Sequence, residues 1–324
     1  MKNRILIPVL FILCLLLCAC SSAPITLPGE NFSREEIAEN GITQRHFIIE
    51  SEGFSLNAVY TYVPDGKHHP TVLLIAGSGP ADCDSTVGAW KPLEDIALGL
   101  AAQGVNSLRL DKRTLNGADR FRPTDGVAEE YVTDCLAALA CLRAAGIEDV
   151  YLLGHSLGGQ IAAELAANTP GIRGMILFHS TPRHLADVAC DQYTRADPSN
   201  AAAYRFYADA AKSATEETAK GYYYYGAPDY YWVTYNGLDT VAAIRKASVP
   251  TLIINSTADG QMFQADLAAW KPLADDQDVT IRLNDGINHF GYCADTSDPT
   301  ELEREYPFSQ TLIDQFADFC KEHS

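Results

Sequence analysis

The 324-residue sequence has few positive charges and no apolar run long enough to span a bilayer. It carries 24 Lys+Arg against 42 Asp+Glu, a formal net charge of −18, and nucleic acids and anionic membrane surfaces repel a chain of that sign. A spanning helix needs about 20 apolar residues, and the apolar run from Ile5 to Leu17 is shorter. With 23 glycines, 16 prolines and 47% hydrophobic residues, fibrous and disordered chains are excluded as well.

The N-terminus has the pattern of an export signal. Lys2 and Arg4 precede the short apolar run, as the charged region of a signal peptide precedes its apolar region. The residues Leu17-Cys18-Ala19-Cys20 resemble the bacterial lipobox, in which the last cysteine receives lipid and becomes the new N-terminus. This resemblance implies a signal peptide over residues 1–19 and a lipid anchor on Cys20.

We expect residues 20–42 to form a tether between the lipid anchor and a folded domain, so that the protein is exported and held on the outer face of a bacterial membrane. Ordinary secretory cleavage near Ala19 or Ala23 is the alternative. Loss of the signal leaves 22 basic against 42 acidic residues, a charge of −20. The expected membrane contact is therefore made by acyl chains and not by electrostatic attraction.

Six cysteines follow the expected anchor, too few for a disulfide scaffold in a chain with ample core. Cys135 and Cys141 fall on one predicted helix with side chains that diverge, so they cannot pair with each other. The sequence otherwise leaves disulfides and buried free thiols equally open. The six are Cys83, Cys135, Cys141, Cys190, Cys293 and Cys320.

The body of the chain alternates strand and helix patterns. Two β-rich runs around Glu52-Gly53 predict an antiparallel hairpin. Short runs rich in Val, Ile and Leu then recur between helical patterns, as they do in a doubly wound, mostly parallel α/β sheet whose ligands bind at the carboxyl ends of the strands. The expected parallel strands are 71–76, 105–110, 150–153, 174–178, 250–255 and 279–283, and the expected helices are 90–103, 127–145, 160–167 and 263–273.

One interval is too long for a crossover between neighbouring strands. Residues 181–249 contain a helical stretch, 201–219, and an aromatic stretch, 221–235, and we expect them to form a cap inserted into a core of residues 43–180 and 250–324. The cap aromatics either form a wall for a sugar ring or an aryl ester or pack the cap on the core. Packing is the favoured interpretation.

A G-x-S-x-G motif, Gly154-His155-Ser156-Leu157-Gly158, lies between a predicted strand and a predicted helix, which is the context that a nucleophile elbow requires. A serine in a sharp turn projects its hydroxyl above the sheet, and the glycines allow strand and helix to approach closely. Ser156 is therefore the predicted nucleophile, with the Leu157 N–H as one oxyanion donor. A structural turn in which Ser156 only caps the helix is the alternative.

Serine needs a base and the base needs an acid. His289 lies in the loop after the last predicted strand, at the sheet edge expected for Ser156, whereas the side chain of His155 should point away and His179 fits a structural or pocket-lining role. In the order Ser, acid, His, Asp259 follows the strand 251–256. Asp259 is the predicted acid, with Asp229, Asp239 and Asp266 as alternatives.

The loop Gly77-Ser78-Gly79-Pro80 follows the first parallel strand. Its glycines allow backbone amides to turn toward a ligand, and we expect the Ser78 N–H to be the second oxyanion donor; a loop that only packs is the alternative. The loop lacks the Lys-Ser/Thr of a P-loop and the third glycine of a dinucleotide fingerprint, so no nucleotide site is expected.

From about Thr43 to Lys321 the chain resembles the α/β-hydrolase superfamily, and within it the bacterial carboxylesterases of the Gly-Ser-Gly-Pro type, which are related to serine aminopeptidase-like hydrolases. The resemblance implies hydrolysis of small carboxylic esters through an acyl-enzyme, without metal or organic cofactor. Two departures are the Thr114-Leu115-Asn116-Gly117 that follows Arg113, where many relatives have Gly-x-Gly, and Cys83, where a basic residue is common. The motifs that carry the resemblance are residues 74–82, 109–113, 154–159 and the loops at Asp259 and His289.

Two other functions stay open at this point. A peptidase or amidase with the same residues would use carboxylates of the cap to recognise an amino group, and Asp187, Asp191 and Asp229 are the candidates. A non-catalytic binding lipoprotein with the same fold is the second. The sequence leaves acyl length, alcohol and oligomeric state open.

Overall fold

The computed structural model describes residues 34–38, 41–122, 124–294 and 299–324. The predicted signal peptide of residues 1–19 and the predicted lipid anchor Cys20 lie outside the described residues. Within them, no helix is both long and apolar enough to cross a membrane.

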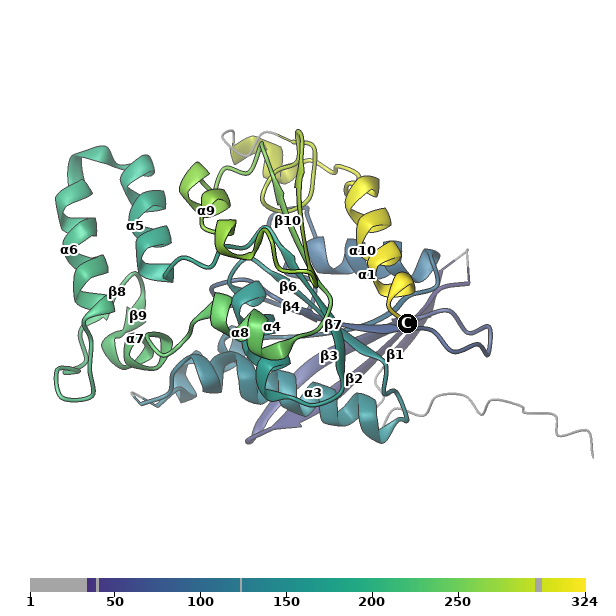
Figure 1. Ribbon diagram of the computed structural model, residues 1–324. Helices are drawn as coiled ribbons and strands as arrows, with labels where there is room; N and C mark the ends of the chain where they lie inside the picture. The colour runs from purple at the N-terminus through teal and green to yellow at the C-terminus, as the bar shows by residue number, and fades with distance from the viewer. Residues whose placement is uncertain (1–33, 39–40, 123, 295–298) are drawn as a thin grey trace, which may run out of the picture.

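A nine-stranded sheet organises the molecule (Figure 1). The first three strands pair in antiparallel fashion and join β5 through β3, and the strands from β5 onward are parallel. The predicted hairpin and the predicted doubly wound sheet are thus confirmed. In spatial order the strands are β1 (Arg34–Ile37), β2 (Thr43–Ser51), β3 (Phe54–Tyr62), β5 (Asn106–Leu110), β4 (Thr71–Ile75), β6 (Val150–His155), β7 (Ile172–Phe178), β10 (Thr251–Ser256) and β11 (Val279–Asn284).

Helices cover both faces of the sheet, as Figure 1 shows. Alternate strand residues feed two separate cores: Leu73 and Leu152 point to one face, Leu74 and Leu153 to the other. Burial of these side chains, each worth roughly 1.5–3 kcal/mol, fixes the register of the sheet. On the first face lie α3 (Thr133–Ala144), α4 (Leu157–Asn168) and α8 (Thr240–Ala247), and on the second α1 (Pro92–Ala102) and α10 (Gln310–Glu322).

Residues 181–249 leave the sheet and return to it. Their helices α5 and α6 stand apart from the sheet, at the left of Figure 1. Tyr231, Trp232 and Tyr235 are buried, whereas Tyr222 and Tyr223 are 63% and 68% exposed. These aromatic side chains of α7 therefore pack in the interior, whereas those of Tyr222 and Tyr223 face solvent. The segment comprises α5 (Leu185–Ala196), α6 (Ala201–Lys212), the small ribbon β8 (Tyr223–Tyr224) and β9 (Ala227–Pro228), α7 (Asp229–Tyr235) and α8.

One glutamine ties this segment to the core. Gln160 of α4 donates through Nε2 to the carbonyls of Thr181 and Arg183, at 2.7 and 3.0 Å. Its Oε1 accepts a hydrogen bond from the hydroxyl of Tyr235 in α7. The start of the segment, just after β7, and its helix α7 are therefore both hydrogen-bonded to α4, the helix that follows Ser156.

Four local features differ from the sequence prediction, the first being that the helix expected over 263–273 divides into α9 (Gln264–Ala268) and the 3₁₀ turn η4 (Lys271–Leu273). Residues 34–37 lie in the predicted tether, yet they form β1, which pairs with β2 and is anchored by the 2.9 Å ion pair of Glu35 and Arg45. The helix predicted over 127–145 begins as a π-helical turn, η2 (Ala128–Val132), before α3. The helix predicted over 201–219 ends at Lys212, because the Ser213 hydroxyl bonds the Asp209 carbonyl and competes with the next turn.

Other short elements complete the structure. They are α2 (Thr114–Gly117), η1 (Ala118–Arg120), η3 (Pro198–Asn200), α9 (Gln264–Ala268), η4 (Lys271–Leu273) and η5 (Pro299–Glu303).

Candidate active site

Ser156 stands in a strained turn between β6 and α4. Its φ of 55° and ψ of −122° are unusual for a residue with a side chain and mark stored backbone strain. The flanking glycines permit the turn, because a Cβ on Gly154 would lie 2.0 Å from the Gly158 carbonyl oxygen and one on Gly158 2.4 Å from that of Ile75. Backbone packing thus fixes Ser156, partly exposed, at the N-terminus of α4.

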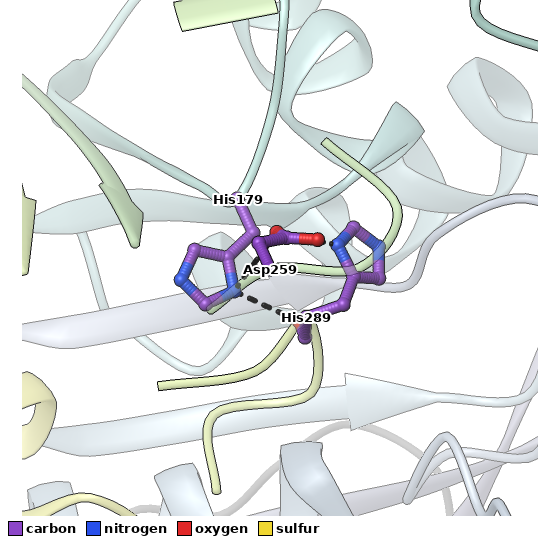
Figure 2. A group of neighbouring side chains, drawn as sticks. All are labelled: His179, Asp259 and His289. Atoms are coloured by element: carbon purple, nitrogen blue, oxygen red, sulfur yellow. Dashed lines mark hydrogen bonds and ion pairs between the residues drawn. The ribbon is translucent and has the colours of Figure 1, made fainter. Parts of the chain in front are cut away.

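His289 and Asp259 form a buried pair (Figure 2). The Nδ1 of His289 lies 2.8 Å from Asp259 Oδ2, and Asp259 Oδ1 accepts the N–H groups of Gln261 and Met262 at 2.8 and 2.9 Å. Burial opposes ionisation of Asp259, but the charge and hydrogen bond of His289 outweigh it and hold the pKa of the carboxyl well below its usual range. The carboxylate therefore keeps the proton of His289 on Nδ1 and leaves Nε2 free to act as a base.

Two further histidines hold the backbone of His289. His155 Nε2 and His179 Nδ1 each lie 2.9 Å from the His289 carbonyl oxygen, and His179 Nε2 lies 2.7 Å from Ser256 Oγ. Burial lowers the pKa of His179 to about 4 and that of His155 well below its usual value, so both are neutral donors at neutral pH. The backbone of His289, the predicted base, is thereby held by side chains at the carboxyl ends of β6 and β7.

The contact between His155 and the loop of His289 could not be predicted from the sequence. The His155 side chain contacts the loop of the predicted base, with ring centroids 4.7 Å from His289, and this contact places the turn of Ser156 and the base at one edge of the sheet. The motif gave no signal for it, because the contact joins positions 134 residues apart. For His179, the predicted structural role agrees with its contacts.

The group of His179, Asp259 and His289 also has the composition of a metal site, since one ligand atom from each lies within 4.8 Å of the others. Figure 2 shows instead that the inward nitrogens face hydrogen-bond partners. Both nitrogens of His179 and the Nδ1 of His289 are engaged. The arrangement is that of a hydrogen-bonded support for a base.

The buried histidines predict a loss of stability in acid. An unfolded histidine takes up a proton near pH 6.5, whereas His179 in the folded protein resists it down to about pH 4, so the unfolded state binds more protons in that window and the free energy of unfolding falls as the pH falls. Between pH 7 and 5 we expect His179 to account for roughly 2 kcal/mol of this loss. Urea unfolding at both pH values measures it.

His179→Gln should shrink the difference between pH 7 and pH 5 by that amount. His68→Gln is the matched control, because the His68 side chain is 70% exposed, and it should leave the difference unchanged. Equal pH dependence in His179→Gln and the parent protein would show that His179 is not buried in its neutral form.

The loop after β4 lies against Ser156, the predicted nucleophile. A Cβ on Gly77 would approach Ser156 Cβ to 3.2 Å. Ser78 is exposed, and within the described part of the chain no acceptor takes its N–H. Leu157 is the first residue of α4, where N–H groups lack intrahelical partners. Both predicted oxyanion donors thus belong to backbone segments beside Ser156.

The first departure from the family pattern, Thr114–Gly117, forms the short helix α2, and the second, Cys83, is partly buried. Arg113 is buried and pairs with Asp134 at 2.6 Å before the short helix α2. The N–H of Cys83 donates to Asp111 at 2.8 Å, and burial raises the pKa of its thiol far above the usual range. All six cysteines named above are free thiols, so the disulfide alternative finds no pair among them.

Comparison with known proteins identifies the family to which the chain is similar. Residues 72–303 match the model of the alpha/beta hydrolase family. Esterase EstD of Thermotoga maritima is 28% identical over 300 residues, which cover 91% of this chain and 69% of that protein.

Solved structures show the same fold at lower identity. Est1E from Butyrivibrio proteoclasticus with bound ferulic acid is 17% identical, with a TM-score of 0.57 and coverage of 86% of this chain and 98% of that one. Proline iminopeptidase from Mycobacterium smegmatis is also 17% identical, with a TM-score of 0.54 and the same coverage. With the family model matching most of its length and the strand order, elbow and His–Asp pair described above, the chain belongs to the alpha/beta hydrolase family.

Proposed function

We propose that this protein is a serine esterase that hydrolyses small carboxylic esters through an acyl-enzyme. The observation that carries the proposal is the 2.8 Å pair of His289 Nδ1 and Asp259 Oδ2, at the sheet edge where the strained turn presents Ser156. The name of EstD as an esterase supports the ester class.

The mechanism follows from the roles of these groups. Ser156 Oγ attacks the ester carbonyl while His289 Nε2 takes its proton, and Asp259 stabilises the imidazolium. The N–H groups of Ser78 and Leu157 bind the oxyanion, each worth roughly 2.7–4 kcal/mol of barrier. The imidazolium then protonates the leaving alcohol, and water repeats the sequence on the acyl-enzyme, which releases the acid and restores Ser156.

The contacts of the cap weigh against recognition of an amine. Asp187 is paired with Arg205 and Lys212 at 2.9 Å, Asp191 with Arg183 at 2.6 Å. Asp229 accepts the backbone N–H groups of residues 220–222. These three candidate carboxylates are thus already engaged, which favours the ester class over the amide class.

A fluorophosphonate probe and two substrate series test the proposal. The protein should be labelled by the probe and should hydrolyse p-nitrophenyl esters, with a graded preference across acyl lengths. Preference for aminoacyl p-nitroanilides over esters would assign the peptidase function, and absence of labelling would assign a non-catalytic role.

We also propose that the mature protein is a lipoprotein, from the Leu17-Cys18-Ala19-Cys20 pattern. In the native host, Cys20→Ser is expected to move the protein from the membrane fraction to the soluble fraction, because the acylated thiol is lost and a body of charge −20 has no electrostatic affinity for the membrane. Cys18→Ser is the matched control and should stay in the membrane fraction. Fractionation with immunoblotting measures both, and a soluble parent protein would refute the anchor.

A further inference from the structure

A buried ammonium group lies behind the loop of Ser78. Lys112, two residues beyond β5, is only 6% exposed. Its Nζ lies 2.6 Å from the Gly79 carbonyl oxygen, 2.6 Å from the Tyr131 hydroxyl and 2.8 Å from Glu130 Oε1. Burial lowers the pKa of Lys112, and the charge of Glu130 opposes this shift. A buried charge is costly to desolvate even when it is paired, so the groups that Lys112 contacts indicate its role.

Besides the Gly79 carbonyl, the network reaches the peptide group that joins Gly77 and Ser78. Tyr131 accepts a hydrogen bond from Lys112 and donates its own proton to the Gly77 carbonyl oxygen at 2.6 Å. Lys112 Nζ is itself 3.3 Å from that oxygen. Since the C=O and N–H of a trans peptide point in opposite directions, two donors on the Gly77 carbonyl turn the Ser78 N–H toward the other side.

Little else in the loop fixes this orientation. Ser78 is exposed and Gly79 has a φ of +83°, a conformation that glycine adopts without strain. The Ser78 N–H has no acceptor in the described residues. A rotation of the Gly77–Ser78 peptide would replace the N–H with a carbonyl oxygen, which repels an oxyanion.

One of the two donors, Tyr131, comes from the π-helical turn η2, a conformation often found at functional sites, and so does Glu130, the carboxylate that pairs with Lys112. Glu130 and Tyr131 are consecutive residues of that turn. The turn is also tied to α7, because the N–H of Val127, the residue that precedes the turn, donates to Thr234 Oγ1 at 3.1 Å. The turn therefore lies between the cap and the loop of Ser78.

We propose that Lys112 and Tyr131 are positioning residues that hold the Gly77–Ser78 peptide with its N–H directed at the oxyanion. The inference rests on the proposed esterase function. Neither side chain acts on the substrate itself: both work through the Gly77 carbonyl. Their loss should weaken binding of the tetrahedral transition state more than binding of the ester.

Tyr131→Phe is the sharpest test, because it deletes only the hydroxyl. We expect kcat/KM for p-nitrophenyl acetate to fall roughly 10- to 100-fold, which is part of the loss seen when an oxyanion donor is removed. The fall should come from a lower kcat, and KM should change little. The inhibition constant of an alkyl trifluoromethyl ketone, whose adduct with serine carries the oxyanion, should rise by the same factor. A merely structural residue would not link these two quantities.

Two further variants complete the design. Lys112→Met combined with Glu130→Gln removes both buried charges together and should give the same pattern. Tyr60→Phe is the control, because Tyr60 is 1% exposed and its hydroxyl accepts from Asn106 at 3.1 Å outside the site, so it should keep full kcat/KM. Thermal melting confirms that each variant is folded.

The outcomes separate this inference from the proposed function. A parent protein that neither hydrolyses esters nor reacts with a fluorophosphonate overturns both. An active parent with folded Tyr131→Phe and double variants that keep kcat/KM within twofold overturns the positioning role alone. A fall in kcat/KM without a matching rise in the ketone inhibition constant also overturns it.

Discussion

Ser156→Ala is expected to abolish ester turnover, with a loss of kcat of roughly 10⁶-fold. Alanine removes the only atom that forms the acyl bond, and the remaining donors cannot replace a nucleophile. Stability should change little, because the turn is held by glycine contacts of the backbone and the Ser156 hydroxyl is partly exposed. Hydrolysis of p-nitrophenyl acetate and fluorophosphonate labelling measure the loss, and circular dichroism and thermal melting measure the fold.

A matched serine variant makes the result specific. Ser55 in β3 is exposed and its hydroxyl donates to Glu50 at 2.8 Å, so Ser55→Ala should retain full turnover and labelling. Retained turnover in folded Ser156→Ala would remove Ser156 from the role of nucleophile, and the acyl-enzyme mechanism with it.

Asp259→Asn is expected to lower kcat about 10⁴-fold. The asparagine amide can donate to His289 Nδ1, which favours the tautomer with its proton on Nε2, so that the base can no longer accept the proton of Ser156. The fold should survive, because the asparagine oxygen can still accept the N–H groups that Asp259 accepts from Gln261 and Met262. Steady-state kinetics at several pH values measure the effect.

Asp266→Asn is the control for this prediction, because Asp266 is a nearby buried aspartate that the sequence also allowed as the acid. In the structure it pairs with Arg183 at 3.0 Å and accepts the Phe263 N–H at 2.7 Å. We expect it to lose stability but to keep kcat within a few-fold. A large loss in Asp266→Asn together with near-normal kcat in Asp259→Asn would reverse the assignment.

Local patterns sufficed for most of the sheet. β4 is buried along its whole length, and the continuous apolar run of residues 72–75 records that burial in the sequence. β1 could not be found in this way, since all four of its residues are exposed and three are charged. The π-helical turn η2 was also hidden, because its apolar spacing continues into that of α3.

Among the residues of the candidate site, too, some positions could be predicted from local sequence and others could not. The positions of Ser156, Asp259 and His289 follow from what precedes them in the chain, a strand that ends at the functional edge of the sheet. The contacts of His155, Lys112 and Tyr131 arise only where loops distant in sequence meet, as Tyr131 and Gly77 do across 54 residues. No local pattern marks such a partner, so these roles required coordinates.

Gln160 sets a limit on how the cap can be exchanged. Its amide holds the carbonyls of Thr181 and Arg183 and the hydroxyl of Tyr235, so a graft made at the visible ends of the insertion would sever bonds to the helix behind the nucleophile. A chimera that keeps residues 181–183 and supplies a hydroxyl at the place of Tyr235 preserves all three. We therefore expect a foreign segment in place of residues 181–249 to keep the stability of the parent protein only if it supplies its own partners for the Gln160 amide.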